Sequence, residues 1–203
     1  MKEIHFPKQL AVRFYFDGES PKADSSGAPL YADLEVIEKN GTTLIAAAVT
    51  LEERMIHAVS ALLFGADGET RLKREFFREE IMGTSDFSFA FKCRVFTRLL
   101  ERTGALDAEA IKKLKAGLKK VMEWRNAFAH GKVLHEVTGG FVLLYYCGGH
   151  QELPLNDSFF EHVQSIILSC LYECNGVIQN ALPFGRDPSG SSEFIETSSE
   201  WTT

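Results

Sequence analysis

Residues 107–131 restrict the fold most, because their apolar side chains recur with the period of an α-helix. At about 100° per residue, one stripe of this segment is apolar. The stripe consists of Leu114, Leu118, Val121, Phe128 and Ala129. Asp107 is a favourable N-cap residue, and Gly131 is well placed as a C-terminal cap. The pattern therefore predicts a helix from Asp107 to His130.

Arg125 falls in the middle of this apolar stripe. Burying an unpaired guanidinium is very costly, so Arg125 needs either a carboxylate partner or a cleft between helices or subunits. Glu52 and Glu53, on an earlier predicted helix, are the candidate partners. Two interpretations stay open: an ion pair that ties helices together, and a role in a functional site.

The opposite stripe of the same helix is polar and ends at His130. Its members are Lys112, Lys115, Lys119, Glu123, Asn126 and His130. Near a helix C-terminus the dipole favours a positive charge, and imidazole is the commonest general acid–base group. The alternative is that His130 caps the last carbonyl groups. His57, on the earlier helix, either faces the same site or packs between helices.

The rest of the chain shows further helical and extended patterns. Alternation predicts a strand over residues 9–16, and a composition rich in Gly, Ser, Pro and Asp predicts a loop over residues 17–29. After a break at Asn40-Gly41, Thr42 or Thr43 is expected to cap a helix that continues to residue 64. Shorter helices are predicted over residues 70–80 and 86–102, and Gly104 is expected to terminate the second.

After Lys132 the period of the apolar residues changes to two. Residues 133–138 and 141–147 are predicted to form a hairpin around Gly139-Gly140, with a third strand over residues 150–155. Asn156 or Asp157 then caps a last helix to residue 182. We therefore expect a mainly α protein in three parts. These are an N-terminal extended segment (1–40), a helical domain with a small antiparallel β insertion (41–182, insertion 132–155) and a mobile tail (183–203).

Charge is segregated along the chain, whose formal net charge is −6. Between residues 92 and 132 there are eleven basic and four acidic side chains, a net charge of +7, so the remainder carries −13. The row Arg94, Arg98 and Arg102 and the lysines of the later helix could hold an anionic polymer. The alternative is that both rows are simply solvated helix faces.

Several other classes of protein receive little support. No segment is long and apolar enough for a membrane helix, and the N-terminus does not resemble a signal peptide, so we expect a cytoplasmic protein. Without a signal peptide, free thiols are expected for the four cysteines. Cys170, Cys174 and His162 share a helix face and could form part of a metal site, but no fourth ligand is evident, so no metal or cofactor is expected.

The sequence Arg125-Asn126-Ala-Phe-Ala-His130 resembles the signature of the HEPN superfamily, an Arg followed by a polar residue and, a few residues later, by His. Residues 42–55 and 86–91 are similar to the corresponding helix starts in the branch related to mannitol-operon repressors. The resemblance covers roughly residues 34–182, and it implies a HEPN-like helical bundle.

The resemblance also implies a function. HEPN domains commonly dimerise, and many are metal-independent endoribonucleases of toxin or phage-defence systems, whereas others are non-catalytic regulatory or interaction modules. It implies that Arg125 stabilises charge, Asn126 orients and His130 is the acid–base group. The expected RNA-binding residues are Lys112, Lys115, Lys119, Arg94 and Arg98, and the expected partners are a second copy, RNA and a protein such as an antitoxin. On one ideal helix Arg125 and His130 lie about 140° apart, so they converge only through unwinding at Gly131 or across two subunits.

Overall fold

Helices dominate the part of the chain that the computed structural model describes, which is residues 11–13, 27–65, 68–136 and 140–181. The helices are α1 (Gly27–Phe64), α2 (Arg71–Phe76), the π-helical turn η1 (Phe77–Met82), α3 (Phe89–Thr103), α4 (Ala108–His130) and α5 (Asp157–Asn180). The strands are β1 (Ala11–Arg13), β2 (Lys132–Glu136), β3 (Gly140–Tyr146) and β4 (His150–Pro154). The prediction of a mainly α fold with a small antiparallel β insertion is confirmed.

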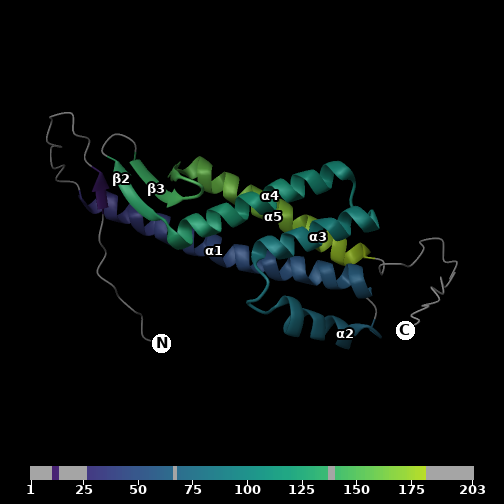
Figure 1. The fold of residues 1–203 in the computed structure, drawn as a ribbon. Coiled ribbons are helices and arrows are strands. Elements are labelled where there is room, and N and C mark those ends of the chain that lie inside the picture. Colours follow the sequence, from purple (N-terminus) through teal and green to yellow (C-terminus); the bar gives the residue numbers. More distant parts are fainter. Residues whose placement is uncertain (1–10, 14–26, 66–67, 137–139, 182–203) are drawn as a thin grey trace.

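Helices α1, α3, α4 and α5 run along one long axis, with the strands at one end and α2 beside α1 toward the other (Figure 1). Apolar stripes of these four helices meet in the main core. Its fully buried side chains include Leu51, Met55, Phe96, Leu118 and Cys174. Burial of these stripes supplies the main driving force for the bundle.

The sheet has the strand order β1-β2-β3-β4. Strands β2, β3 and β4 pair antiparallel as predicted, and β1 adds a parallel edge with Ala11 opposite Leu134. The strand predicted over residues 9–16 is thus confirmed at Ala11–Arg13, and its other residues lie outside the described part. A second, smaller core joins the sheet to α1 and to the end of α4. Its buried members are Leu34, Ile37, Ala127, Phe141, Leu143 and Leu155.

The predicted boundary at residue 40 is wrong, because α1 begins at Gly27 and continues through Asn40-Gly41. The hydroxyl groups of Thr42 and Thr43 do not cap a helix; they donate to the carbonyl groups one turn earlier, at 3.0 and 2.9 Å. A Cβ at position 41 would lie only 2.6 Å from Cδ1 of Phe128 on α4. Gly41 therefore marks a close contact between two helices rather than the end of one. The last three residues of the loop predicted over 17–29 also belong to α1, and residues 17–26 lie outside the described part.

The other helix boundaries follow the predictions closely. α2 and η1 occupy the predicted helix at residues 70–80. α3 starts later than predicted because Ser88, whose hydroxyl accepts a hydrogen bond from the Phe91 amide at 3.2 Å, is its N-cap. Gly104 ends α3 at a φ of 63°, a conformation that favours glycine.

The last helix starts where it was expected, with Asn156 as its N-cap accepting from the Phe159 amide at 2.9 Å. Within the predicted hairpin turn, Gly140 has a φ of 76°, whereas Gly139 lies outside the described residues, as does the predicted mobile tail (183–203). Among the described helices, none has the length and apolar content to cross a membrane.

Candidate functional site

Helix α4 carries the predicted catalytic motif on its last two turns, as expected from its pattern. Asp107 caps the start of the helix by accepting from the Ala110 amide at 2.8 Å, and His130 is the last helical residue. The Gly131 amide still donates to the Ala127 carbonyl at 2.6 Å, so the helix does not unwind before it ends. Arg125 and His130 therefore keep the divergent directions of a regular helix, and one chain does not aim both at one phosphate.

The motif extends beyond the part of α4 that α3 covers. The two helices run antiparallel because only residues 104–107 connect them. α3 has 15 residues and α4 has 23, so roughly the last eight residues of α4 pass the start of α3. There the sheet takes the place of α3, and α1 and α5 remain neighbours of α4.

This change of neighbours rotates the buried face of α4. Trp124 and Ala127 are buried, whereas Phe128 is half-buried and Ala129 is exposed, so the predicted burial of Ala129 is wrong. Phe128 stacks near Phe159 of α5, with ring centroids 6.4 Å apart. The apolar stripe of an isolated helix could not show this rotation, because it depends on which elements cover the last two turns.

Arg125 is half-buried, and the pair with the candidate partners Glu52 or Glu53 is not formed. Glu52 instead binds Lys92 of α3, with Nζ and Oε1 2.6 Å apart. Among the described residues, Arg125 makes no hydrogen bond or ion pair. Its position past the start of α3 leaves the guanidinium partly solvated, which removes the need for a buried carboxylate.

Asn126 and His130 are exposed and continue the polar stripe of α4. Along the helix, His130 lies about 16 Å beyond Lys119, from a rise of 1.5 Å per residue. Gly131 then turns the chain directly into β2; a Cβ at this position would clash with the Ala127 carbonyl oxygen in the last turn of α4 and would lie 2.8 Å from the Leu144 carbonyl oxygen. The glycine predicted as a cap is thus required both by the end of α4 and by the close approach of β3.

All five predicted RNA-binding residues line one groove between α3 and α4, with a volume of about 630 Å³. They are Arg94, Arg98, Lys112, Lys115 and Lys119. All five side chains are exposed, and Glu101 is the acidic residue among the lining side chains. Cys93, Thr97 and Leu118 contribute to the lining between the two basic rows. We call this feature the basic groove.

The basic groove is preorganised only in part. Lys119 lies 3.8 Å from Glu123 in an exposed ion pair, which contributes little to stability and leaves the lysine free to exchange partners. The Arg94 guanidinium lies 5.2 Å from the centre of the Phe91 ring, in a cation–π contact. The groove thus offers exposed cations from each of its two helices along a partly apolar floor.

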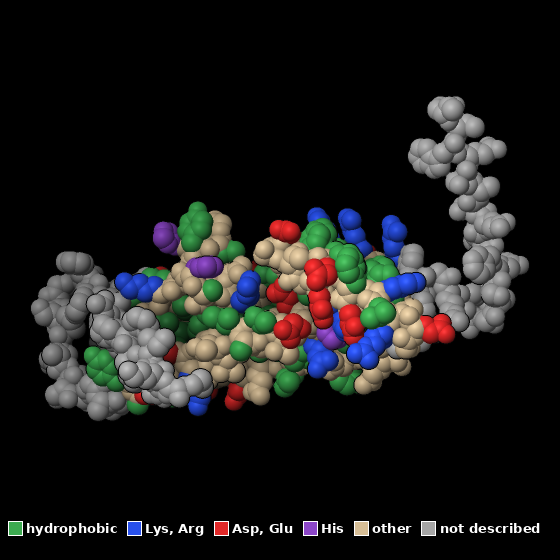
Figure 2. Space-filling model, turned by 90° about the horizontal axis from the view of Figure 1, so that it is seen from below, with side chains coloured by type: hydrophobic (Ala, Val, Ile, Leu, Met, Phe, Trp, Pro, Cys, Tyr) green, Lys and Arg blue, Asp and Glu red, His purple; other side chains and the backbone are tan. Residues whose placement is uncertain are grey.

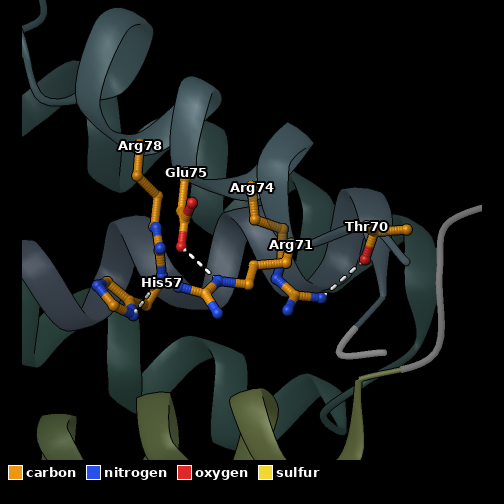
Figure 3. Close-up of polar contacts among 6 residues, drawn as sticks. All are labelled: His57, Thr70, Arg71, Arg74, Glu75 and Arg78. Atoms are coloured by element: carbon orange, nitrogen blue, oxygen red, sulfur yellow. Dashed lines mark hydrogen bonds and ion pairs between the residues drawn. The ribbon is translucent and has the colours of Figure 1, made fainter. Parts of the chain in front are cut away.

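A second polar cluster, which the sequence did not indicate, joins α1 to α2 and η1 (Figure 3). Arg78 Nη1 lies 3.1 Å from His57 Nδ1, and because guanidinium only donates, the imidazole accepts and is neutral. Burial lowers the pKa of His57, and the positive charges of Arg78 and Arg54 lower it further, while Glu53 raises it. His57 therefore holds η1 against α1 and does not face Arg125 and His130.

The two arginines of α2 make local contacts. Arg71 pairs with Glu75 at 2.8 Å, and Arg74 donates to the Thr70 hydroxyl at 2.8 Å (Figure 3). Acidic and basic side chains are mixed on the face over α1 and α2 (Figure 2). This face lacks the excess of positive charge that distinguishes the basic groove.

The ion pair between Lys92 and Glu52 lies in a pocket next to this cluster. Lys92 is buried, with only 5% of its surface exposed. Its position between Phe89 and Phe96, at helical spacing, was the sequence signal that it faces the core. The pair connects α1 to α3 and lies outside the basic groove.

The cysteines do not form the metal corner considered from the sequence. Cys170 and Cys174 lie in the main core, where burial raises their pKa values to about 11 and about 12. His162 is exposed and lies 3.2 Å from Lys120 Nζ. In the described part of the chain, no three His, Cys, Asp or Glu side chains gather in a metal-binding arrangement.

Comparisons of the chain with protein-family models, with curated proteins and with solved structures give no match. The motif at the end of α4 and the basic groove beside it are therefore the features from which a function can be inferred.

Proposed function

We propose that this protein is a metal-independent endoribonuclease of the HEPN type, in a toxin or phage-defence role. The observation that carries the proposal is the basic groove, in which five cations from two helices face one another. One of its two rows lies on the same stripe of α4 as Asn126 and His130. An RNA strand whose phosphates follow this row is led toward the histidine.

The chemistry requires a base near a 2′-hydroxyl group and a cation near the developing charge on phosphorus. His130 is exposed and free to reach a ribose, so it suits the acid–base role. Arg125 suits the charge-stabilising role because it is half-buried without an internal partner among the described residues. Since the two diverge on one helix, we infer that Arg125 of one copy acts with His130 of a second copy in a homodimer.

Incubating the purified protein with mixed RNA in EDTA tests the proposal. We expect cleavage by the wild type, and a loss of at least about 100-fold in His130→Ala, the lower end of typical general acid–base contributions. His150→Ala is the matched control, because His150 is also exposed but lies on β4. Absence of cleavage by the wild type, or equal cleavage by His130→Ala, would contradict the proposal.

The second candidate is a non-catalytic regulatory or interaction module, similar to the mannitol-repressor branch. The divergence of Arg125 and His130 on a continuous helix favours it. This candidate predicts that the protein binds RNA or a protein partner without cleaving RNA. Binding in the anisotropy assay described below, together with no cleavage in EDTA, would support it over the ribonuclease.

A further inference from the structure

Phe87 and Phe91, at the start of α3, form an aromatic pair that the fold does not explain. Their rings are nearly parallel, with an interplanar angle of 22° and centroids 4.7 Å apart. Both side chains are half-buried, and neither belongs to the two hydrophobic cores of the described residues. The start of α3 is already capped by Ser88. The two rings therefore pack on each other at the surface rather than on the core.

This pair continues directly into the basic groove. The Arg94 guanidinium lies 5.2 Å from the Phe91 ring and at the same time lines the groove. Phe91 thus contacts both Phe87 and Arg94, and we call these three side chains the aromatic stack. Ala90, the residue before Phe91, also lines the groove.

The aromatic stack lies at the end of the groove that is nearer the catalytic motif. Because α3 and α4 are antiparallel, the start of α3 is level with about Met122, one turn before Arg125. Met122 and Ala90 line the same end of the groove, in agreement with this register. A strand that runs along the groove toward His130 must pass the aromatic stack.

We infer that the aromatic stack is a subsite for an unpaired base of the RNA strand whose phosphates lie in the basic groove. The inference rests on the RNA-binding role proposed above and extends it to the substrate. Flat aromatic rings and guanidinium groups next to a cationic groove are the combination that binds single strands. The bases of a single strand can stack on such groups because they are not already held inside a duplex. Arg94 would then contact both a base and the neighbouring phosphate.

The test compares two strands of about 12 nucleotides, a length within the site sizes of single-strand binders. One is a fluorescent 2′-O-methyl oligoadenylate, which lacks the free 2′-hydroxyl needed for cleavage, and the other is an abasic strand with the same phosphates. Fluorescence anisotropy gives the dissociation constant of each. We expect the strand with bases to bind about 5- to 150-fold more tightly, the range for one stacked base.

Phe91→Leu is the decisive variant, because it keeps an apolar side chain of similar size and removes the flat ring. We expect it to abolish most of the preference for the strand with bases and to leave the affinity for the abasic strand unchanged. Phe91→Trp should retain the preference. Phe76→Leu, on α2 and 61% exposed outside the groove, is the matched control and should behave like the wild type.

The possible failures are distinguishable. If the wild type binds both strands equally, or if Phe91→Leu keeps the preference, the stacking inference is wrong and the basic groove stands. If the wild type binds neither strand, the RNA-binding role is wrong, and the stacking inference fails with it. The wild-type protein alone shows whether the strand with bases binds more tightly than the abasic strand. This result can overturn the inference even if Phe91→Leu does not fold.

Discussion

His57 and Arg78 illustrate how a single contact can couple the structure to pH. The imidazole accepts a hydrogen bond from a permanent cation, so protonation of His57 both removes the acceptor and places two positive charges together. The segment that this contact holds is weakly buried: α2 has no buried residue, and Met82 is the buried residue of η1. The contact therefore matters for how firmly η1 lies on α1.

We predict that the free energy of unfolding decreases as the pH falls from 7.5 through 6.5. The pKa of His57 is lowered in the folded state, so below its unfolded value of about 6.5 the unfolded chain binds more protons and is favoured. Urea unfolding at pH 7.5 and 5.5 measures this decrease. His57→Gln, which keeps an acceptor for Arg78 but does not titrate, should reduce the difference between the two pH values.

His150→Gln, at an exposed position on β4, serves as the control and should retain the full difference. An identical pH dependence in the wild type and in His57→Gln would show that the contact with Arg78 does not couple folding to protonation.

At the scale of elements, periodicity predicted most of the helices and strands, but not the start of α1 or the contacts between elements. α4 was predictable to the residue because its cap, its stripes and its final glycine agree with one another. A break was expected at Asn40-Gly41 because glycine has a low helix propensity. It was wrong because Gly41 lies inside α1, where the missing side chain allows a close approach to Phe128. No local signal distinguishes these two uses of glycine.

The two glycines Gly41 and Gly176 provide a test of this interpretation. Gly176, in α5, has nothing within 4 Å of a Cβ, so Gly176→Ala should stabilise the protein by about 0.5–1 kcal/mol through helix propensity. Gly41→Ala should instead destabilise it by about 1–3 kcal/mol, because the new methyl group overpacks against Phe128. Urea unfolding of both variants measures the difference, and stabilisation by Gly41→Ala would contradict a close contact there.

The basic residues of the groove were predictable from the sequence, but their arrangement was not. The sequence showed two separate basic rows, and only the short connection between α3 and α4 brings Arg94 and Lys115 to one groove. Of the two interpretations of Arg125, the buried carboxylate partner is not found, because a helical wheel does not show where a neighbouring helix begins. The contact of His57 with Arg78 depends on how η1 packs, which has no periodic signal.

At the scale of the whole molecule, a chain with a net charge of −6 gathers five of its 22 basic side chains along one groove. Binding of a single strand there should depend strongly on salt, with a logarithmic slope near −0.7 for each phosphate neutralised and about −3.5 if all five cations take part. Replacing both Lys112 and Lys115 by Gln should make the slope less steep by about 1.4.

The control for this measurement replaces Lys39 and Lys73, two exposed lysines on α1 and α2 away from the groove, by Gln. The net charge changes equally in both double variants, so a difference between their salt slopes must come from the position of the lysines in the basic groove. Equal slopes for the two double variants would indicate that the protein attracts RNA without using the basic groove.

The central claim is that Arg125 and His130 act together across two copies of the chain on RNA held in the basic groove. Co-expression of Arg125→Ala with His130→Ala tests it, with RNA cleavage in EDTA as the readout. Each variant alone should be inactive, whereas random mixing gives half heterodimers with one intact composite site, or about a quarter of wild-type activity. If the mixture is as inactive as the separate variants while the wild type cleaves RNA, the two residues do not form a site between copies.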